Sequence, residues 1–302
     1  MAGPSRLDLD HLGDCALCRL VSRWRDWHRL PVATREHLAR DGVELVYWTW
    51  PGREPAVLLL HGIGNYGRYW SFVADAMAGR LRLIAPDARG HGESGRPADG
   101  YTSAEFVADA LAILDGNAIE RAVVVGHSMG GSHAMDLAGR YPDRVRALVI
   151  VDASPEPLAE GSIRATRLLT ERPQRFGSRE EARAYLVRTS PGYRDEMYEN
   201  RVEWGFRDDA GALVWRSDPN ALRKIIAART SLPERWALLE AIQCPTLVVR
   251  GTRSNVVSEE VAQRMASTLA DGLLMELDTG HNVALERPRE LADAVFAIAA
   301  RR

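Results

Sequence analysis

Short apolar runs alternate along this chain with longer segments in which apolar residues recur every three or four positions. Short runs are typical of buried strands, and the longer period is typical of amphipathic helices. The runs predict strands over residues 43–48, 56–60, 81–84, 122–125, 147–151, 246–250 and 273–276. The periodic segments predict helices over 103–115, 129–141, 259–269 and 289–300. Alternating strands and helices predict an α/β fold with a mostly parallel sheet.

Two local signals refine this pattern. Thr102 and Glu105 have the spacing of a capping box, which predicts the start of the helix over 103–115. Residues 155–238 break the alternation, because they are helix-rich, charged and contain many aromatic residues. The chain of 302 residues therefore predicts one large α/β domain with an insertion.

The sequence Gly126-His127-Ser128-Met129-Gly130 lies between a predicted strand and a predicted helix. This is the setting of a nucleophile elbow, in which a serine sits on a strained turn between small residues. The helix that follows places its positive N-terminal end beneath the serine hydroxyl. The alternative interpretation is a tight turn whose serine only caps the helix.

A nucleophile that attacks a carbonyl carbon needs backbone N–H groups to bind the developing oxyanion. One donor is expected from Met129, directly after Ser128. The other is expected from Ile63, because the strand that ends at Leu60 is followed by His61-Gly62-Ile63-Gly64. Without the elbow, this segment would be interpreted as an ordinary glycine-rich turn.

Four motifs in chain order resemble the α/β-hydrolase-fold proteins of the esterase, lactonase and cofactor-free haloperoxidase-like branch. They are residues 61–64, 87–94, 126–131 and the pair 280–282 and 286–288. The resemblance covers roughly residues 42–302 and implies the α/β-hydrolase fold. In domain terms it implies a core of residues 41–154 and 239–302, a helical cap of residues 155–238 and an N-terminal extension, residues 1–40, which we expect to be helical. The fold alone does not indicate a substrate.

The same resemblance places the catalytic histidine at His281, after the last strand, which completes the chain order of serine, acid and histidine. A neutral imidazole there can take the proton of Ser128 and later return it to the leaving group. His127 is expected to pack or to donate a hydrogen bond behind the site. His61 and His91 are expected to be structural.

The acid departs from the common pattern of the family. Its usual loop, residues 252–257, contains no carboxylate, and Asn255 or, with a one-residue shift, Ser254 occupies the expected place. Asp152 is the strongest substitute, since it ends a neighbouring strand and parallel strand ends open onto one crevice. Some relatives, including zearalenone-type lactonases, take their acid from this strand. The alternatives are Asn255 as a neutral partner, a dyad without an acid, and a site impaired for hydrolysis.

Aromatic and sulfur-containing side chains of the insertion and of the oxyanion loop are candidates for an apolar substrate pocket. Those predicted to line it are Tyr66, Trp70, Met197, Trp204 and Trp215. The alternative is that they only hold the cap together.

The three cysteines are too few for a disulfide framework. Cys15 and Cys18 form a C-x-x-C pair, but no second pair accompanies them, so an amphipathic helix is favoured over a metal or redox site. Cys244 precedes a strand and is expected to be buried and inert. We therefore expect neither a metal nor a cofactor.

The formal net charge of −2 gives no electrostatic footprint for nucleic acid or for an anionic membrane. No apolar stretch is long enough to span a bilayer, and residues 1–10 lack an apolar signal core, so a cytoplasmic protein is expected. The expected partner is a small-molecule ester or lactone, and a homodimer is left open.

Together these residues predict a serine hydrolase that cleaves a carboxylic ester or lactone through an acyl-enzyme. A rival within the same fold catalyses C–C bond hydrolysis, acyl transfer or cyclisation. A rival of another class is a ligand-binding module with little turnover.

Overall fold

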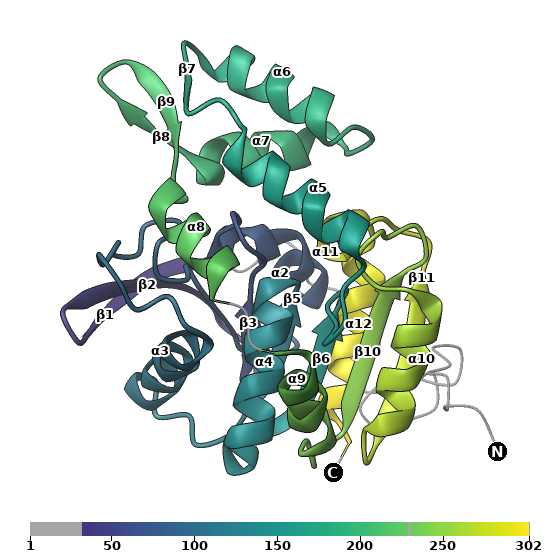
Figure 1. Cartoon of the computed structure of the whole chain (residues 1–302). Coiled ribbons are helices and arrows are strands. Elements are labelled where there is room, and N and C mark those ends of the chain that lie inside the picture. Colours follow the sequence, from purple (N-terminus) through teal and green to yellow (C-terminus); the bar gives the residue numbers. More distant parts are fainter. Residues whose placement is uncertain (1–31, 229–230, 302) are drawn as a thin grey trace.

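The computed structural model describes residues 32–228 and 231–301, and an eight-stranded sheet forms the centre of this part of the chain (Figure 1). The strand order is β1-β2-β4-β3-β5-β6-β10-β11. The strands are β1 (Thr34–Arg40), β2 (Val43–Trp50), β3 (Val57–Leu60), β4 (Leu83–Pro86), β5 (Ala122–His127), β6 (Val145–Val151), β10 (Thr246–Gly251) and β11 (Gly272–Leu277). β2 pairs antiparallel with both of its neighbours, and the other strands run parallel. The predicted fold class is confirmed, and every predicted strand is present.

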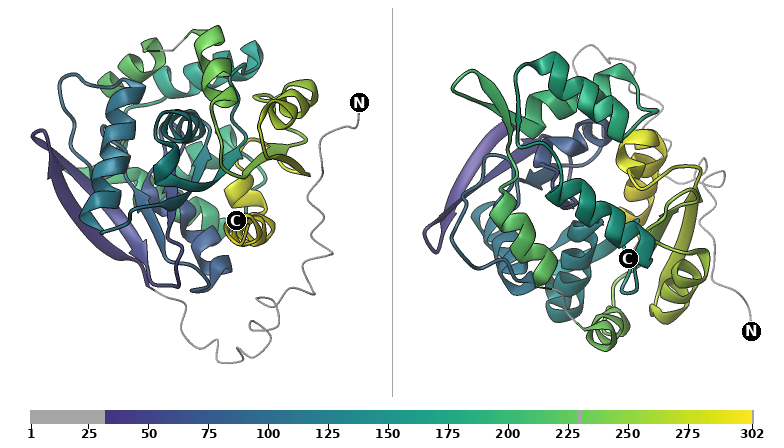
Figure 2. Two further views of the ribbon diagram at one scale, coloured as in Figure 1. Left: turned by 90° about the horizontal axis from the view of Figure 1, so that it is seen from below. Right: turned by 45° about the horizontal axis from the view of Figure 1, so that its top comes forward.

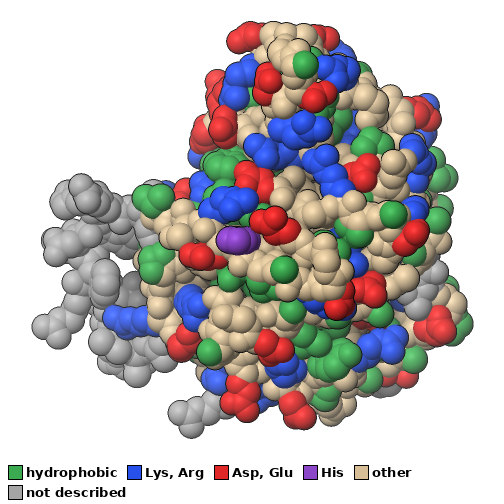
Figure 3. Space-filling model, turned by 90° about the vertical axis from the view of Figure 1, so that its left-hand side faces the viewer, with side chains coloured by type: hydrophobic (Ala, Val, Ile, Leu, Met, Phe, Trp, Pro, Cys, Tyr) green, Lys and Arg blue, Asp and Glu red, His purple; other side chains and the backbone are tan. Residues whose placement is uncertain are grey.

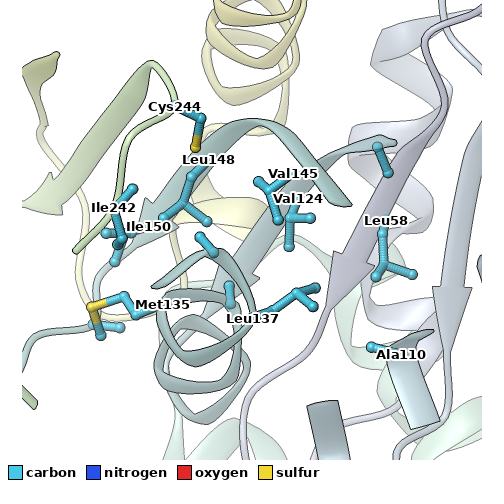
Figure 4. Packing of buried hydrophobic residues seen from close by; sticks show 14 of the residues in the cluster. Leu58, Ala110, Val124, Met135, Leu137, Val145, Leu148, Ile150, Ile242 and Cys244 are labelled. Carbon is cyan, nitrogen blue, oxygen red and sulfur yellow. The ribbon is translucent and has the colours of Figure 1, made fainter. Parts of the chain in front are cut away.

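Helices cover both faces of the sheet, as a mostly parallel sheet requires. On one face Val124, Leu148 and Ile150 pack in the cluster that Figure 4 shows, against helices α3, α4, α9 (Leu232–Glu240) and α10. On the other face the alternate residues Val123 and Val149 pack against α2, α11 and α12. The helices of the core are η2 (Gly67–Trp70), α2 (Ser71–Met77), α3 (Ser103–Gly116), α4 (Met129–Arg140), η3 (Pro142–Arg144), α10 (Glu259–Thr268), α11 (Val283–Glu286) and α12 (Pro288–Ala299).

The predicted capping box at the start of α3 is wrong. Thr102 is the N-cap residue, but its side chain makes no capping hydrogen bond. Glu105 instead accepts a hydrogen bond from Arg40 at 2.9 Å, because an arginine of the neighbouring β1 offers it a charged partner. A hydrogen bond between two charged groups competes effectively with the bond to a backbone N–H that a capping box requires.

The N-terminal extension also differs from the prediction. Residues 34–40 form strand β1 and not a helix, and residues 1–31 lie outside the described residues. Asp41 and Gly42 have φ angles of 50° and 76°, which are the positive values of a two-residue hairpin turn. This Asp-Gly pair aligns β1 with β2 along its whole length, so the sheet begins before residue 41.

The insertion is mixed and not purely helical. In Figures 1 and 2 the elements of the insertion from α5 to α8 lie next to one another over one end of the sheet. Its elements are α5 (Ala159–Thr170), β7 (Arg175–Phe176), α6 (Arg179–Thr189), α7 (Asp195–Gly205), β8 (Phe206–Asp209), β9 (Ala212–Trp215), α8 (Pro219–Ala227) and α9 (Leu232–Glu240). β7, β9 and β8 form a small antiparallel sheet. Trp236 and Leu239 of α9 belong to the central apolar cluster, so α9 packs with the core.

Charged side chains of both signs are interspersed on the face shown in Figure 3, in keeping with the small net charge. Within residues 32–228 and 231–301, no helix has the length and apolar character needed to cross a bilayer.

Candidate active site

Ser128 occupies a strained turn between β5 and α4. Its φ of 54° and ψ of −117° are rarely adopted by a residue with a side chain, so the surrounding structure must hold it there. The neighbouring glycines permit the close packing of strand and helix. A Cβ atom on Gly126 would lie 2.3 Å from the Gly130 carbonyl oxygen, and one on Gly130 would lie 2.2 Å from that of Leu60. Both glycines are therefore required by the geometry of the elbow.

His281 lies in the loop between β11 and α11, and its Nδ1 is 2.6 Å from Oδ2 of Asp152. The carbonyl oxygen of His281 accepts a hydrogen bond from Nε2 of His127 at 2.9 Å. His127 is buried and supports the loop from behind, and burial lowers its pKa well below the usual range. Because Asp152 occupies Nδ1 of His281, the other ring nitrogen remains for the reacting group.

Asp152 follows the last residue of β6, and its side chain is fully buried. Burying a carboxylate is costly unless donors surround it. Here the N–H of Gly251 donates to Oδ1 at 3.1 Å, and the hydroxyl of Ser254 donates to Oδ2 at 2.5 Å, beside the ring of His281. The loop after β10, where the family usually carries its acid, thus supplies two donors to an acid from β6.

Asn255 does not take part in this network, since the hydrogen bond at Nδ1 of His281 goes to Asp152. The carbonyl oxygen of Asn255 lies against α5, where a Cβ atom on Gly161 would be 2.1 Å away. The side chain beside Nδ1 of His281 is therefore that of Asp152, and Ser254 donates a hydrogen bond to it. From the sequence alone, Ser254 is only an alternative to Asn255 at the expected place of the acid, and the hydrogen bond from its hydroxyl to Asp152 is not predicted.

Replacing Ser254 by Ala is expected to lower the catalytic rate constant kcat about tenfold, because a hydrogen bond to a buried charged group is lost. KM should change little, since Ser254 does not line the cavity that holds Ser128. Steady-state kinetics check both values. Ser254→Thr keeps the hydroxyl and should retain activity, as should Ser267→Ala at an exposed position of α10. An unchanged kcat in Ser254→Ala would contradict this role.

Two neutral histidines shape the loop that contains Ile63. The N–H of Gly64 donates to Nε2 of His91 at 2.9 Å, and the N–H of Ala88 donates to Nε2 of His61 at 3.0 Å. An imidazole nitrogen can accept a bond only when it is deprotonated. Burial lowers the pKa of His61 to about 3 and that of His91 to about 4, which keeps both rings neutral. The predicted structural role of these histidines agrees with these contacts.

This burial makes stability depend on pH. Below pH 6.5 the unfolded chain takes up protons at four histidines whose pKa values in the folded state are lowered, namely His61, His91, His127 and His133. Burial raises the pKa of Asp87 to about 6, so the folded state takes up one proton there, which acts in the opposite direction. The net difference of about three protons should lower the free energy of unfolding by about 4 kcal/mol per pH unit near pH 5.

Urea unfolding at pH 7, 6 and 5 measures this slope. His91→Gln keeps an acceptor for the N–H of Gly64 and should reduce the slope by about one proton, whatever it does to absolute stability. A slope that is flat between pH 6 and 5 would contradict the neutral histidines.

One cavity of about 220 Å³ contains the candidate catalytic groups. Ser128, Met129, Ile63 and His281 line it together. Met129 is the first residue of α4, so its N–H has no acceptor within the helix. The arrangement can hold a carbonyl group between a nucleophile, an imidazole and backbone donors.

The predicted pocket residues do not line this cavity, and that prediction is corrected. Trp70 and Met197 are buried in the apolar cluster beside α2. The hydroxyl of Tyr66 donates to Asn200 of α7 at 2.9 Å. Trp204 packs edge-on against Trp48 with ring centroids 4.9 Å apart.

Trp215 packs elsewhere in the cap, on Phe206 with a centroid distance of 4.1 Å and under the guanidinium of Arg172. Large aromatic faces bury the most apolar area, and here they join the cap to the core or stabilise the small sheet. The cavity is lined instead by smaller residues of α4, α5, α8 and α9.

Among residues 32–228 and 231–301, no cluster of three or more His, Cys, Asp or Glu side chains could hold a metal ion. Cys15 and Cys18 lie outside the described residues. Cys244 is buried, as predicted, and burial raises the pKa of its thiol.

Comparison with known protein families matches residues 57–294 to the model of the alpha/beta hydrolase family. The chain belongs to the alpha/beta hydrolase family. Relatives of this hydrolase include the 3-hydroxybutyrate-oligomer hydrolase of Cupriavidus necator, 30% identical over 268 residues, which cover 82% of this chain and 89% of the relative. An esterase of Mycobacterium tuberculosis is 30% identical over 261 residues, which cover 82% of this chain and 84% of the relative.

Solved structures support the same fold assignment for this alpha/beta hydrolase. The crystal structure of E-2-(acetamidomethylene)succinate hydrolase superposes with a TM-score of 0.82 over 89% of this chain and 100% of that chain. Its sequence is 23% identical, so this likeness shows the fold alone.

Proposed function

We propose that this alpha/beta hydrolase cleaves a carboxylic ester or lactone, with Ser128, His281 and Asp152 as its catalytic triad. The observation that carries the proposal is the contact of 2.6 Å between His281 and the buried Asp152, in a loop that lines one cavity with the strained Ser128. Triads are identified by such geometry and roles and not by sequence position. The family relatives named hydrolase and esterase support ester chemistry.

In the proposed first step, Oγ of Ser128 attacks the carbonyl carbon of the substrate and its proton passes to Nε2 of His281. The imidazolium that forms is stabilised by the carboxylate of Asp152. The N–H groups of Ile63 and Met129 bind the oxyanion of the tetrahedral intermediate. When the intermediate collapses, the C–O bond to the alcohol breaks and His281 donates the proton to that oxygen, leaving Ser128 acylated.

In the second step, water loses a proton to His281 and attacks the acyl carbon. Collapse of the second tetrahedral intermediate returns the proton to Oγ of Ser128 and releases the carboxylic acid. With a lactone, the alcohol and the acid remain parts of one product.

Rapid mixing with p-nitrophenyl acetate tests this function. An acyl-enzyme whose hydrolysis is slower than its formation gives a burst of p-nitrophenolate equal to the enzyme concentration. A ligand-binding module gives neither the burst nor steady turnover above that of Ser128→Ala. That result would reject the proposed function.

A further inference from the structure

The cavity at Ser128 continues along one side of α4. Ser128, Ser132 and Asp136 are four residues apart and all line it, so they share one face of the helix. The eight steps from Ser128 to Asp136 correspond to about 12 Å along the helix axis at 1.5 Å per residue. An extended covalent chain advances roughly 3.5 Å per three bonds, so this distance is roughly ten bonds.

The middle of the cavity is apolar or lined by small residues. Helices α5, α8 and α9 lie over α4 here, and α9 contacts α4 directly. The apolar and small residues that line it include Met135, Gly161, Ala165, Leu169, Ile225 and Leu238. This stretch is suited to an alkyl chain.

The far end of the cavity is polar, because Ser103, His133 and Asp136 line it together. The hydroxyl of Ser103 donates its single proton to Oδ2 of Asp136. Nδ1 of His133 lies 2.9 Å from the same hydroxyl oxygen, so the ring must donate there through an Nδ1–H. The ring stacks on Phe106 with centroids 4.4 Å apart, which fixes its orientation.

With the protons of Ser103 and His133 assigned in this way, two hydrogen-bond acceptors remain. In a neutral ring protonated at Nδ1, Nε2 of His133 is an acceptor. Neither Nε2 of His133 nor Oδ1 of Asp136 has a hydrogen-bond partner among the described residues. Burial lowers the pKa of His133 to about 3, so the ring stays neutral near pH 7. A buried acceptor without a donor is costly, and a ligand that supplies a donor recovers that cost.

Charges around this end favour a neutral donor over an ion. Nε of Arg140 is 3.6 Å from Oδ1 of Asp136, and Arg235 also lines the cavity. The negative charge of Asp136 disfavours a ligand carboxylate, and the two arginines disfavour a ligand ammonium. A neutral donor such as a hydroxyl meets both conditions.

We propose that the cavity takes an ester whose chain lies along α4 and carries a hydroxyl group roughly ten bonds from the scissile carbonyl carbon. The hydroxyl donates to Asp136 or His133 at the polar end. This substrate class rests on the proposed function, because it requires Ser128 to hold the reacting end of the ester.

Alkylboronic acids test this substrate class. They do not require a decision on whether the acyl part or the alcohol part of the ester carries the chain that lies along α4. The oxygen of Ser128 adds to boron, its proton passes to His281, and the tetrahedral boronate leaves one alkyl chain to enter the cavity. Calorimetry compares octylboronic acid with 8-hydroxyoctylboronic acid on the full chain. We expect the hydroxyl to tighten binding about tenfold. Between butylboronic and 4-hydroxybutylboronic acid we expect no such gain, because the shorter chain does not reach Asp136.

Variants locate the effect. His133→Phe keeps the stacking on Phe106 and removes Nε2, and Asp136→Asn removes the charge with little change in shape. At least one of them should reduce the preference for the hydroxyl below about threefold while octylboronic acid binds as before. Ser162→Ala, a lining residue on α5, is the matched control and should retain the preference.

The outcomes separate the two proposals. If octylboronic acid binds the unaltered protein as tightly as its hydroxyl analogue, the substrate class is wrong and the proposed function stands. A preference that survives in both variants also overturns the assignment to this polar end. If neither boronic acid binds, the proposed function itself fails.

Discussion

Asp152→Asn is expected to lower kcat/KM for an activated ester by about 10⁴-fold. The buried carboxylate accepts a bond from Nδ1 of His281, which leaves Nε2 able to take a proton from Ser128. An asparagine at this place can offer an N–H to Nδ1 and hold the wrong tautomer, and it cannot stabilise the imidazolium. Steady-state kinetics with p-nitrophenyl esters measure the loss, and circular dichroism checks that the variant is folded.

Asn255→Ala is the matched control for the acid, because this residue occupies the place where the family usually carries it. Its activity should stay within about threefold of the unaltered protein, as expected for a residue without a hydrogen bond to the triad. The reverse pattern, with a large loss in Asn255→Ala and a small one in Asp152→Asn, would show that the neutral partner is the correct one.

Ser128→Ala is expected to reduce kcat by about 10⁶-fold, the largest effect predicted for this protein. The change removes the only atom that would bond to the substrate and leaves the oxyanion donors of Ile63 and Met129. A residual rate above that of water is therefore expected. Because alanine has the same backbone limits as serine at a positive φ, the midpoint of thermal unfolding should change little.

The control for this change is Ser132→Ala, one helical turn further along the same cavity wall. It should retain catalysis of short activated esters. If Ser128→Ala kept more than a tenth of the activity, Ser128 could not be the nucleophile.

The strands and the elbow could be predicted from sequence because their signals are local. Apolar runs mark β3, β5 and β6, and the glycines around Ser128 are dictated by backbone contacts that a Cβ atom would block. Strand β1 was missed although its signal was also local. The Asp41-Gly42 pair that forms the hairpin turn was the informative feature.

For the acid of the triad, the sequence could only narrow the candidates to residues at the ends of two strands, β6 and β10. A sequence shows that the loop after β10 lacks a carboxylate, but which strand end faces His281 depends on the register of β6 beside β10. Ser254 is a clearer case. Its hydroxyl serves a residue 102 positions away in the chain, and no local pattern encodes that contact.

The pocket could not be predicted because the sequence of the cap does not show which of its side chains face the cavity. Large aromatics such as Trp204 and Trp215 were expected in the cavity, but they bury more area between elements. The polar end formed by Ser103, His133 and Asp136 joins α3 to α4 and was not foreseen.

The most direct test of the triad is the rate at which a fluorophosphonate labels the protein, followed by mass spectrometry of its peptides. The phosphonyl group should be found on Ser128, and labelling should be at least 100-fold slower in Asp152→Asn but unchanged in Asn255→Ala. Labelling of a different residue, or equal rates in the unaltered protein and Asp152→Asn, would contradict a triad of Ser128, His281 and Asp152.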